Sequence, residues 1–95
     1  MLANGDRQIK ISLLLEHKSS PSKYIHLQLL RYMINIWENQ QSSKQELTAV
    51  ICIVFYHGKQ MWARREMIEK VPEELQRFIP RFEYILFDTR DIEDN

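Results

Sequence analysis

Residues 47–56 read Leu-Thr-Ala-Val-Ile-Cys-Ile-Val-Phe-Tyr and form the most apolar stretch of the chain. Valine and isoleucine are frequent in it, and β-branched side chains fit the pleated surface of a strand better than they fit a helix. A run this apolar is typical of a strand at the centre of a parallel sheet, with both faces covered. Gly58 ends the run. We therefore expect a buried central strand here.

A second strand and a long helix are predicted before this stretch. Residues 8–16 alternate at first between polar and apolar side chains and then become wholly apolar, which indicates a strand that enters a buried region. Residues 19–22, Ser-Ser-Pro-Ser, are a helix-start signal, because serine caps free N–H groups and proline suits the first turn. The helix should run from about residue 21 to about residue 40. Its buried face, by three- and four-residue spacing, should carry Leu27, Leu30, Ile34 and Trp37.

The order of these segments predicts an α/β fold. A strand, a long helix and a buried strand form a βαβ unit, in which the two strands are parallel because a helical crossover joins them. A short helix is expected at residues 72–78 and a third strand at residues 82–88, whereas residues 59–70 carry no clear pattern. The sequence thus predicts a βαβ unit with a third strand and short helices.

Length and composition limit the classes of function. A chain of 95 residues makes at most one small domain, which buries roughly two-thirds of its unfolded surface. The 13 basic and 13 acidic residues give a net charge of zero, so the chain has no global electrostatic footprint for nucleic acid. Gly5 and Gly58 are the two glycines, which is too few for a Gly-rich phosphate loop.

The cysteine and histidine content bears on location and metals. Cys52 is the single cysteine, so an internal disulfide is impossible and the reducing cytoplasm is the simplest compartment. No signal peptide is visible and no apolar stretch approaches the roughly 18 residues of a membrane span, so no membrane partner is expected. His17, His26 and His57 lack ligand-like spacing, and we expect no zinc site.

Glu16 and Lys18 are the first candidates for chemistry. They lie two residues apart at the end of the first predicted strand, so both side chains should project to one face. A metal-dependent nuclease needs such a pair, because a carboxylate helps to hold Mg²⁺ and an ammonium group can orient water or neutralise charge on phosphorus. The pair also occurs by chance in many proteins.

Gln28 and Tyr32 lie four residues apart in the predicted helix and therefore share one helical face. Near the start of the helix they could reach the same place as Glu16 and Lys18. The alternative is that Tyr32 lies at the edge of the core and that Gln28 is simply solvated.

Several landmarks along the chain resemble one family. They are residues 13–21 (Leu-Leu-Leu-Glu-His-Lys-Ser-Ser-Pro), 29–33 (Leu-Leu-Arg-Tyr-Met), 54–58 (Val-Phe-Tyr-His-Gly) and 78–84 (Phe-Ile-Pro-Arg-Phe-Glu-Tyr). In this order they resemble the Rpn family of recombination-promoting nucleases, the YhgA-like transposases, within the PD-(D/E)xK superfamily. Trp62 and Asp88 extend the resemblance, which covers roughly residues 9–88.

The resemblance implies a restriction-endonuclease-like core and a Mg²⁺-dependent DNA endonuclease that promotes recombination. By this resemblance Glu16 is a metal ligand, Lys18 occupies the catalytic position, and Gln28 with Tyr32 forms the supporting pair on the helix. Many members of the family carry Gln at the position of Lys18, where this chain follows the more general superfamily pattern. DNA is the implied partner.

One departure concerns the first catalytic acid. Residues 4–6, Asn-Gly-Asp, predict a hairpin turn, and three residues precede it, which are too few for the strand that carries this acid in the family. Asp6 is a poor substitute, because ten residues of extended chain separate it from Glu16 by about 33 Å. The helical region that usually follows the core is also missing after Asn95. We therefore expect residues 1–95 to be one partial, truncated domain of the PD-(D/E)xK kind.

Three functions remain open from the sequence. The first is an active endonuclease core. The second is a catalytically silent remnant that binds DNA, a second copy or a full-length relative. The third is a small interaction module whose sheet edge pairs with another chain.

Overall fold

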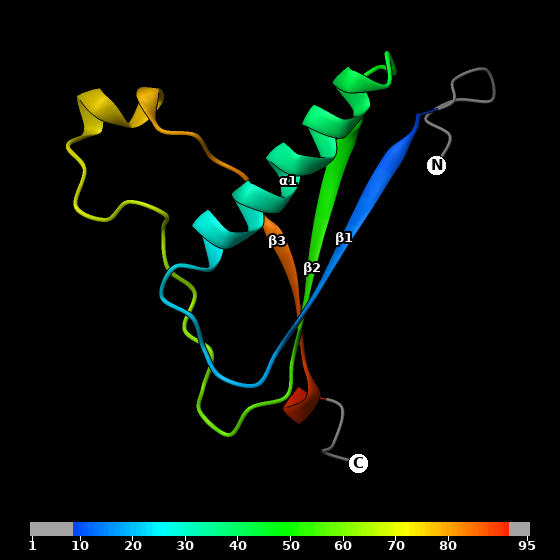
Figure 1. Ribbon diagram of the computed structural model, residues 1–95. Helices are drawn as coiled ribbons and strands as arrows, with labels where there is room; N and C mark the ends of the chain where they lie inside the picture. Colours follow the sequence, from blue (N-terminus) through cyan, green and yellow to red (C-terminus); the bar gives the residue numbers. More distant parts are fainter. Residues whose placement is uncertain (1–8, 92–95) are drawn as a thin grey trace.

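The computed structural model describes residues 9–91, which form a three-stranded parallel sheet with one long helix against it (Figure 1). The strand order in the sheet is the order in the sequence, β1-β2-β3. The elements are β1 (Ile11–Lys18), α1 (Ile25–Ser42), β2 (Ala49–Tyr56), β3 (Tyr84–Asp88) and two 3₁₀ helices, η1 (Glu73–Phe78) and η2 (Thr89–Asp91). The predicted α/β class, the parallel βαβ unit and the third strand are confirmed.

The register of the sheet aligns the three carboxyl ends of the strands. Lys18 pairs with Tyr56, and Tyr56 pairs with Asp88, so these residues form one row across the sheet. Because side chains alternate between the faces of a strand, all three point to the same face. That row marks the edge of the sheet where chemistry is expected in parallel α/β folds.

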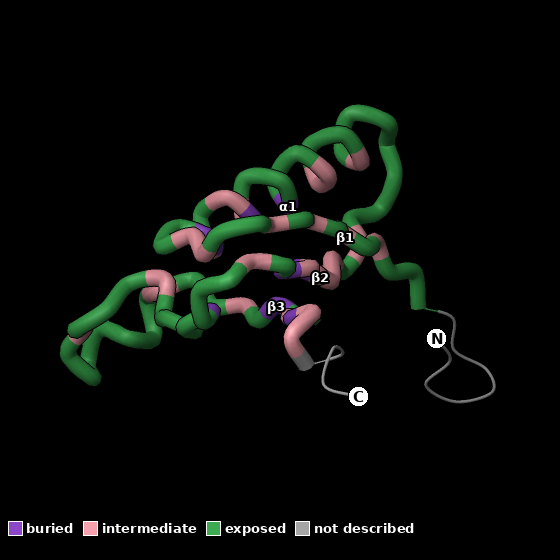
Figure 2. The backbone as a smooth tube through the Cα atoms, turned by 90° about the horizontal axis from the view of Figure 1, so that it is seen from below, coloured by how far each residue is buried: buried purple, intermediate pink, exposed green. Residues whose placement is uncertain are grey.

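The core lies between α1 and one face of the sheet. Its buried residues are Ile25, Leu29, Met33, Cys52, Val54, Tyr56, Trp62 and Tyr84. Figure 2 shows that burial is confined to short stretches of the elements, while most of the chain is exposed. This is the small core that a short chain allows.

The predicted buried face of the helix is wrong in part. Leu27 and Ile34 are 44% and 43% exposed, and the buried positions are Ile25, Leu29 and Met33 instead. The other two predicted residues, Leu30 and Trp37, are partly buried and do pack against the core. The face in contact with the sheet is therefore centred on Leu29 and leaves Leu27 and Ile34 outside it. The helix also begins at Ile25 rather than at residue 21, after a turn, and no side chain caps its amino end.

Polar contacts hold the carboxyl half of α1 to the start of β2. The Trp37 Nε1–H donates to the carbonyl oxygen of Thr48 at 2.7 Å. Gln40 Nε2 donates to the Thr48 hydroxyl at 2.9 Å, and that hydroxyl also shares a hydrogen bond of 2.7 Å with Ser12 on β1. These bonds fix the position of α1 along and above the strands.

The long connection between β2 and β3 extends to one side of the sheet (Figure 1). Trp62 anchors it, because its Nε1–H donates to the Tyr84 hydroxyl at 2.9 Å and its ring is buried. Arg64 lies over the Tyr84 ring at 4.8 Å. Residues 59–70 contain no helix or strand, and the expected helix at 72–78 is the 3₁₀ helix η1.

The face of the sheet opposite α1 is open, which corrects the expectation that the central strand is covered on both faces. Among residues 9–91, α1 is the one long helix, and it lies on the other face. Side chains on the open face stack across the strands: His17 on Phe55 at 5.2 Å between ring centroids, and Phe55 on Phe87 at 5.4 Å. The residues of this face are Ile11, Leu13, Leu15, His17, Ala49, Ile51, Ile53, Phe55, Ile85 and Phe87.

Two further expectations concern the turn near the start of the chain and membrane spans. The predicted turn at residues 4–6 lies outside the described residues. Within residues 9–91, no helix is long and apolar enough to cross a membrane.

Candidate functional site

Glu16 and Lys18 lie on β1, on the face of the sheet that α1 covers. Glu16 pairs with Val54 and Lys18 with Tyr56, and both partners are buried in the core. The rise of a strand places the two Cα atoms about 7 Å apart. Both residues are partly exposed, because β1 is at the edge of the described sheet.

A chain of hydrogen bonds joins Lys18 to α1. Lys18 Nζ donates to Gln28 Oε1 at 2.6 Å, and Gln28 Nε2 donates to the Tyr32 hydroxyl at 3.4 Å. The short first bond is the charge-assisted kind, which fixes the ammonium group in place. Lys18, Gln28 and Tyr32, three of the four residues singled out in the sequence, are therefore linked by hydrogen bonds. Glu16 lies two residues before Lys18 on the same face of β1.

The Glu16 carboxylate has an unsatisfied oxygen. Its Oε2 is buried and has no hydrogen-bond partner among the described residues. A buried polar atom without a partner costs free energy, so native proteins rarely leave one unless a water or an ion binds there. The oxygen is therefore free to accept a hydrogen bond from water or to ligate a cation.

The Glu16 carboxylate is an oxygen ligand of the kind that Mg²⁺ prefers, but it is a single ligand. Mg²⁺ binds oxygen ligands and is often held by one or two carboxylates together with waters and substrate phosphates. Residues 9–91 contain no group of three or more His, Cys, Asp or Glu side chains that could hold a metal ion. Glu16 would thus be the protein ligand that this part of the chain supplies.

Comparison with known proteins adds the family. The model of the family described as "Putative transposase, YhgA-like" matches residues 3–95. The chain belongs to the YhgA-like family. No curated protein and no solved structure matches it. The family that the sequence landmarks resemble is thereby confirmed.

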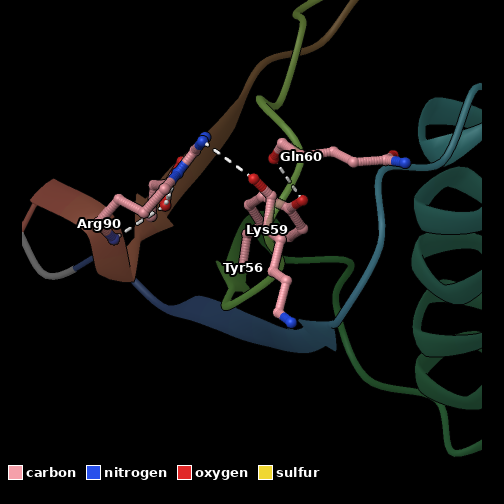
Figure 3. A network of polar contacts seen from close by, with 5 residues as sticks. Tyr56, Lys59, Gln60 and Arg90 are labelled. Carbon is pink, nitrogen blue, oxygen red and sulfur yellow. Dashed lines mark hydrogen bonds and ion pairs between the residues drawn. The ribbon is translucent and has the colours of Figure 1, made fainter.

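The Tyr56-His57-Gly58 landmark of this YhgA-like protein has a structural role at the sheet edge. The Tyr56 hydroxyl donates to the carbonyl oxygen of Gln60, which closes the turn after β2 (Figure 3). A Cβ atom at Gly58 would overlap the Tyr56 ring and the carbonyl oxygen of Ser19. Glycine is needed here because the loop after β1 and the loop after β2 approach each other closely.

Asp88 is a further acid of the YhgA-like core on the same row as Lys18, and the sequence analysis used it as a family landmark without giving it a role in the site. Its carboxylate accepts hydrogen bonds from the Arg90 backbone N–H at 3.0 Å and from Arg90 Nη2 at 2.8 Å. These bonds lower the pKa of Asp88. In this arrangement Asp88 is bound to Arg90, whose Nη1 also reaches the Lys59 carbonyl oxygen at 3.5 Å (Figure 3). An acid at the carboxyl end of a parallel strand was the signal that could have identified it.

His26 of the YhgA-like chain belongs to the core edge. Its ring packs against Phe82 and Tyr84, with centroids 5.5 Å and 5.3 Å away. Burial lowers the pKa of His26, and the nearby Glu66 carboxylate opposes that shift. The histidine is therefore held toward its neutral form beside aromatic rings.

Proposed function

We propose that this YhgA-like chain is the core of a Mg²⁺-dependent DNA endonuclease of the PD-(D/E)xK kind, which promotes recombination. The observation that carries the proposal is the Glu16 carboxylate with its unpartnered buried oxygen, beside an ammonium group held by Gln28. Membership of a transposase family supports it, because such proteins act on DNA. A reducing cytoplasm, where DNA is accessible, suits the free thiol of Cys52.

Each residue has a distinct part in this chemistry. Glu16 would hold the metal through Oε2. A bound divalent metal polarises the scissile phosphate and lowers the pKa of its water. Lys18, fixed by Gln28, places a positive charge where charge develops on the phosphoryl oxygens. Gln28 and Tyr32 hold that ammonium group in position and present an amide and a phenol to the substrate.

The parallel sheet supports the same proposal. Lys18 and its neighbours sit at the carboxyl ends of the strands, where open α/β sheets bind their ligands. The mixed α/β architecture, with three parallel strands and one main helix, is consistent with a restriction-endonuclease-like core.

Plasmid cleavage in Mg²⁺ tests the proposal. We expect nicking of supercoiled DNA by the chain and a loss of at least about a hundredfold in Glu16→Gln, because a metal ligand contributes several kcal/mol to the transition state. The matched control is Glu38→Gln, an exposed glutamate on α1, which should cleave at the wild-type rate. Equal rates in wild type and Glu16→Gln would contradict the assignment.

A second candidate function is a catalytically silent module that binds protein, and the open apolar face of the sheet favours it. Leu13 and Leu15 are 61% and 56% exposed there, and Ile85 and Phe87 are 46% and 47% exposed. A parallel sheet normally has both faces covered. No cleavage under any divalent metal, combined with stable association through this face, would favour the second function over the first.

We propose a second copy of the chain as the partner for this face. The ten residues of the face include no Asp, Glu, Lys or Arg, and His17 is its one titratable group. Two such faces therefore meet without like-charge repulsion, as the self-complementary patch of a twofold dimer requires.

A further inference from the structure

A hollow beside the proposed active site has the chemistry of a nucleotide-binding surface. It has a volume of about 550 Å³ and is lined by Ser22, Tyr24, Leu27, Gln28, Arg31 and Tyr32. Sites for ligands of nucleotide size have volumes of about 300–1,000 Å³. The hollow is therefore large enough to accept one nucleotide.

The hollow is next to the proposed reaction centre because Gln28 belongs to both. Its side chain accepts the hydrogen bond from Lys18 Nζ and donates to the Tyr32 hydroxyl. Gln28 and Tyr32 lie four residues apart on one side of α1, and Tyr24, the residue just before the helix, lines the same hollow. A nucleotide in this hollow would place its neighbouring phosphate near Lys18.

The side chains around the hollow suit an aromatic base and a phosphate. Tyr24 is 64% exposed and Tyr32 is 37% exposed, so both phenol rings offer surface to a ligand. Leu27, which is 44% exposed, adds an apolar surface between them. Arg31 contributes a guanidinium group to the lining, and Lys23 lies 5.8 Å from the centre of the Tyr24 ring.

A larger hollow on the molecule is a poorer match for DNA. It is lined mainly by the segment between β2 and β3 and has a volume of about 760 Å³. Its lining includes the acids Glu66, Glu69 and Glu83 and the bases Lys70 and Arg81. The three carboxylates outnumber the two cationic groups, so this lining is less favourable to phosphate. The hollow beside Gln28 has no acidic residue in its lining, so it is the better site for a polyanion.

We propose that the hollow formed by Tyr24, Leu27, Arg31 and Tyr32 binds an unpaired nucleotide of DNA next to the cleavage point. The proposal rests on the nuclease function above and specifies its substrate. Base faces inside a duplex are covered by their neighbours, and a tyrosine can stack on a base only where the strand is single or the base is turned out. The preferred substrate is therefore DNA with a single-stranded segment or a junction.

Binding, measured apart from cleavage, tests the inference. A fluorescein-labelled oligo(dT) and a duplex of equal length are titrated with the protein in EDTA, and fluorescence anisotropy gives the two dissociation constants. Wild type should bind the single strand more tightly than the duplex. Tyr24→Ala should weaken single-strand binding about tenfold, since stacking on one aromatic ring contributes about 1–3 kcal/mol per base.

Tyr24→Phe is the matched control, because it keeps the ring and removes the hydroxyl. It should bind the single strand within about twofold of wild type. Arg31→Ala should weaken the binding of single strands. It should also reduce the slope of log Kd against log salt concentration by about one, the value for one lost phosphate contact. Circular dichroism melts confirm that the variants fold, which is expected because Tyr24 is 64% exposed.

The results separate the subsite from the nuclease. If single-strand binding depends on the Tyr24 ring but the protein does not cleave DNA, the subsite is supported and the nuclease function is rejected. Cleavage that depends on Glu16, with single-strand binding unchanged by Tyr24→Ala, would support the nuclease function and reject the subsite. The absence of any preference for single strands in wild type also overturns the subsite.

Discussion

At the scale of single residues, the site combines fixed groups with one unsatisfied atom. Lys18 is held by Gln28, and Asp88 is held by Arg90, so both charges on the row have defined partners. Glu16 Oε2, one step back on the same face, has none among the described residues. Asp88 is thus held by a partner at the end of β3, whereas the partner of Glu16 Oε2 in the proposed function is a cation.

The Asp88–Arg90 pair predicts a change of stability in acid. The folded state lowers the pKa of Asp88 below its ordinary value of about 3.9, chiefly through hydrogen bonds from Arg90. Its contribution is therefore complete above about pH 4 and is lost as the pH falls through the folded pKa. Asp88→Asn should unfold at lower urea concentration than wild type at pH 7, and the gap should narrow toward pH 2. Parallel curves for the two proteins across this range would contradict the role of the pair.

At the scale of elements, α1 is positioned by contacts at both ends. Leu29 is fully buried near its amino end, and Trp37 and Gln40 bond to Thr48 at the other end. The helix thereby presents Gln28 and Tyr32 to β1, and the same rotation leaves Tyr24, Leu27 and Arg31 open. The orientation of α1 thus places both the proposed active site and the hollow beside it.

Leu29 and Leu27 form a matched pair for testing that orientation. Leu29→Ala should reduce the free energy of unfolding by about 2–5 kcal/mol, because it removes a fully buried side chain and leaves a cavity. Leu27→Ala, at a position 44% exposed, should change it by less than about 0.5–1 kcal/mol. Urea titration followed by tryptophan fluorescence measures both. A larger effect at Leu27 than at Leu29 would mean that the helix face carrying Leu27 is the one that contacts the sheet.

At the scale of the whole molecule, one face of the sheet is covered and one is open. A small core under α1 has to stabilise the described fold, while a row of apolar side chains on the other face stays in contact with water. Exposed apolar patches of this kind mark interaction surfaces.

Association through the open face is tested by molar mass. Light scattering after size exclusion should show a mass that rises with the concentration of wild type. Leu13→Lys should bring that mass to the monomer value, since it places a charge on the apolar face, which is 61% exposed at this residue. The control is Leu75→Lys on η1, 51% exposed and away from the sheet, which should associate like wild type. A wild type that stays monomeric at every concentration would rule out the second copy as partner.

The local pattern of the sequence determined the elements. The apolar run at residues 47–56, the helix signal before it and the apolar segment at residues 82–88 gave two strands and a helix within a few residues of their bounds. Glu16 and Lys18 were expected on one face because strand alternation requires it, and Gln28 and Tyr32 were paired because helical spacing requires it. Such patterns depend on neighbours along the chain and need no tertiary contacts.

The tertiary structure decided which faces of the elements meet. The spacing of apolar residues on α1 predicted a buried face that includes Leu27, and contact with the sheet buried Leu29 instead. The same contact brought Gln28 to Lys18 and left one sheet face open. These outcomes depend on residues far apart in the sequence, whose packing energies are settled only when the whole core forms.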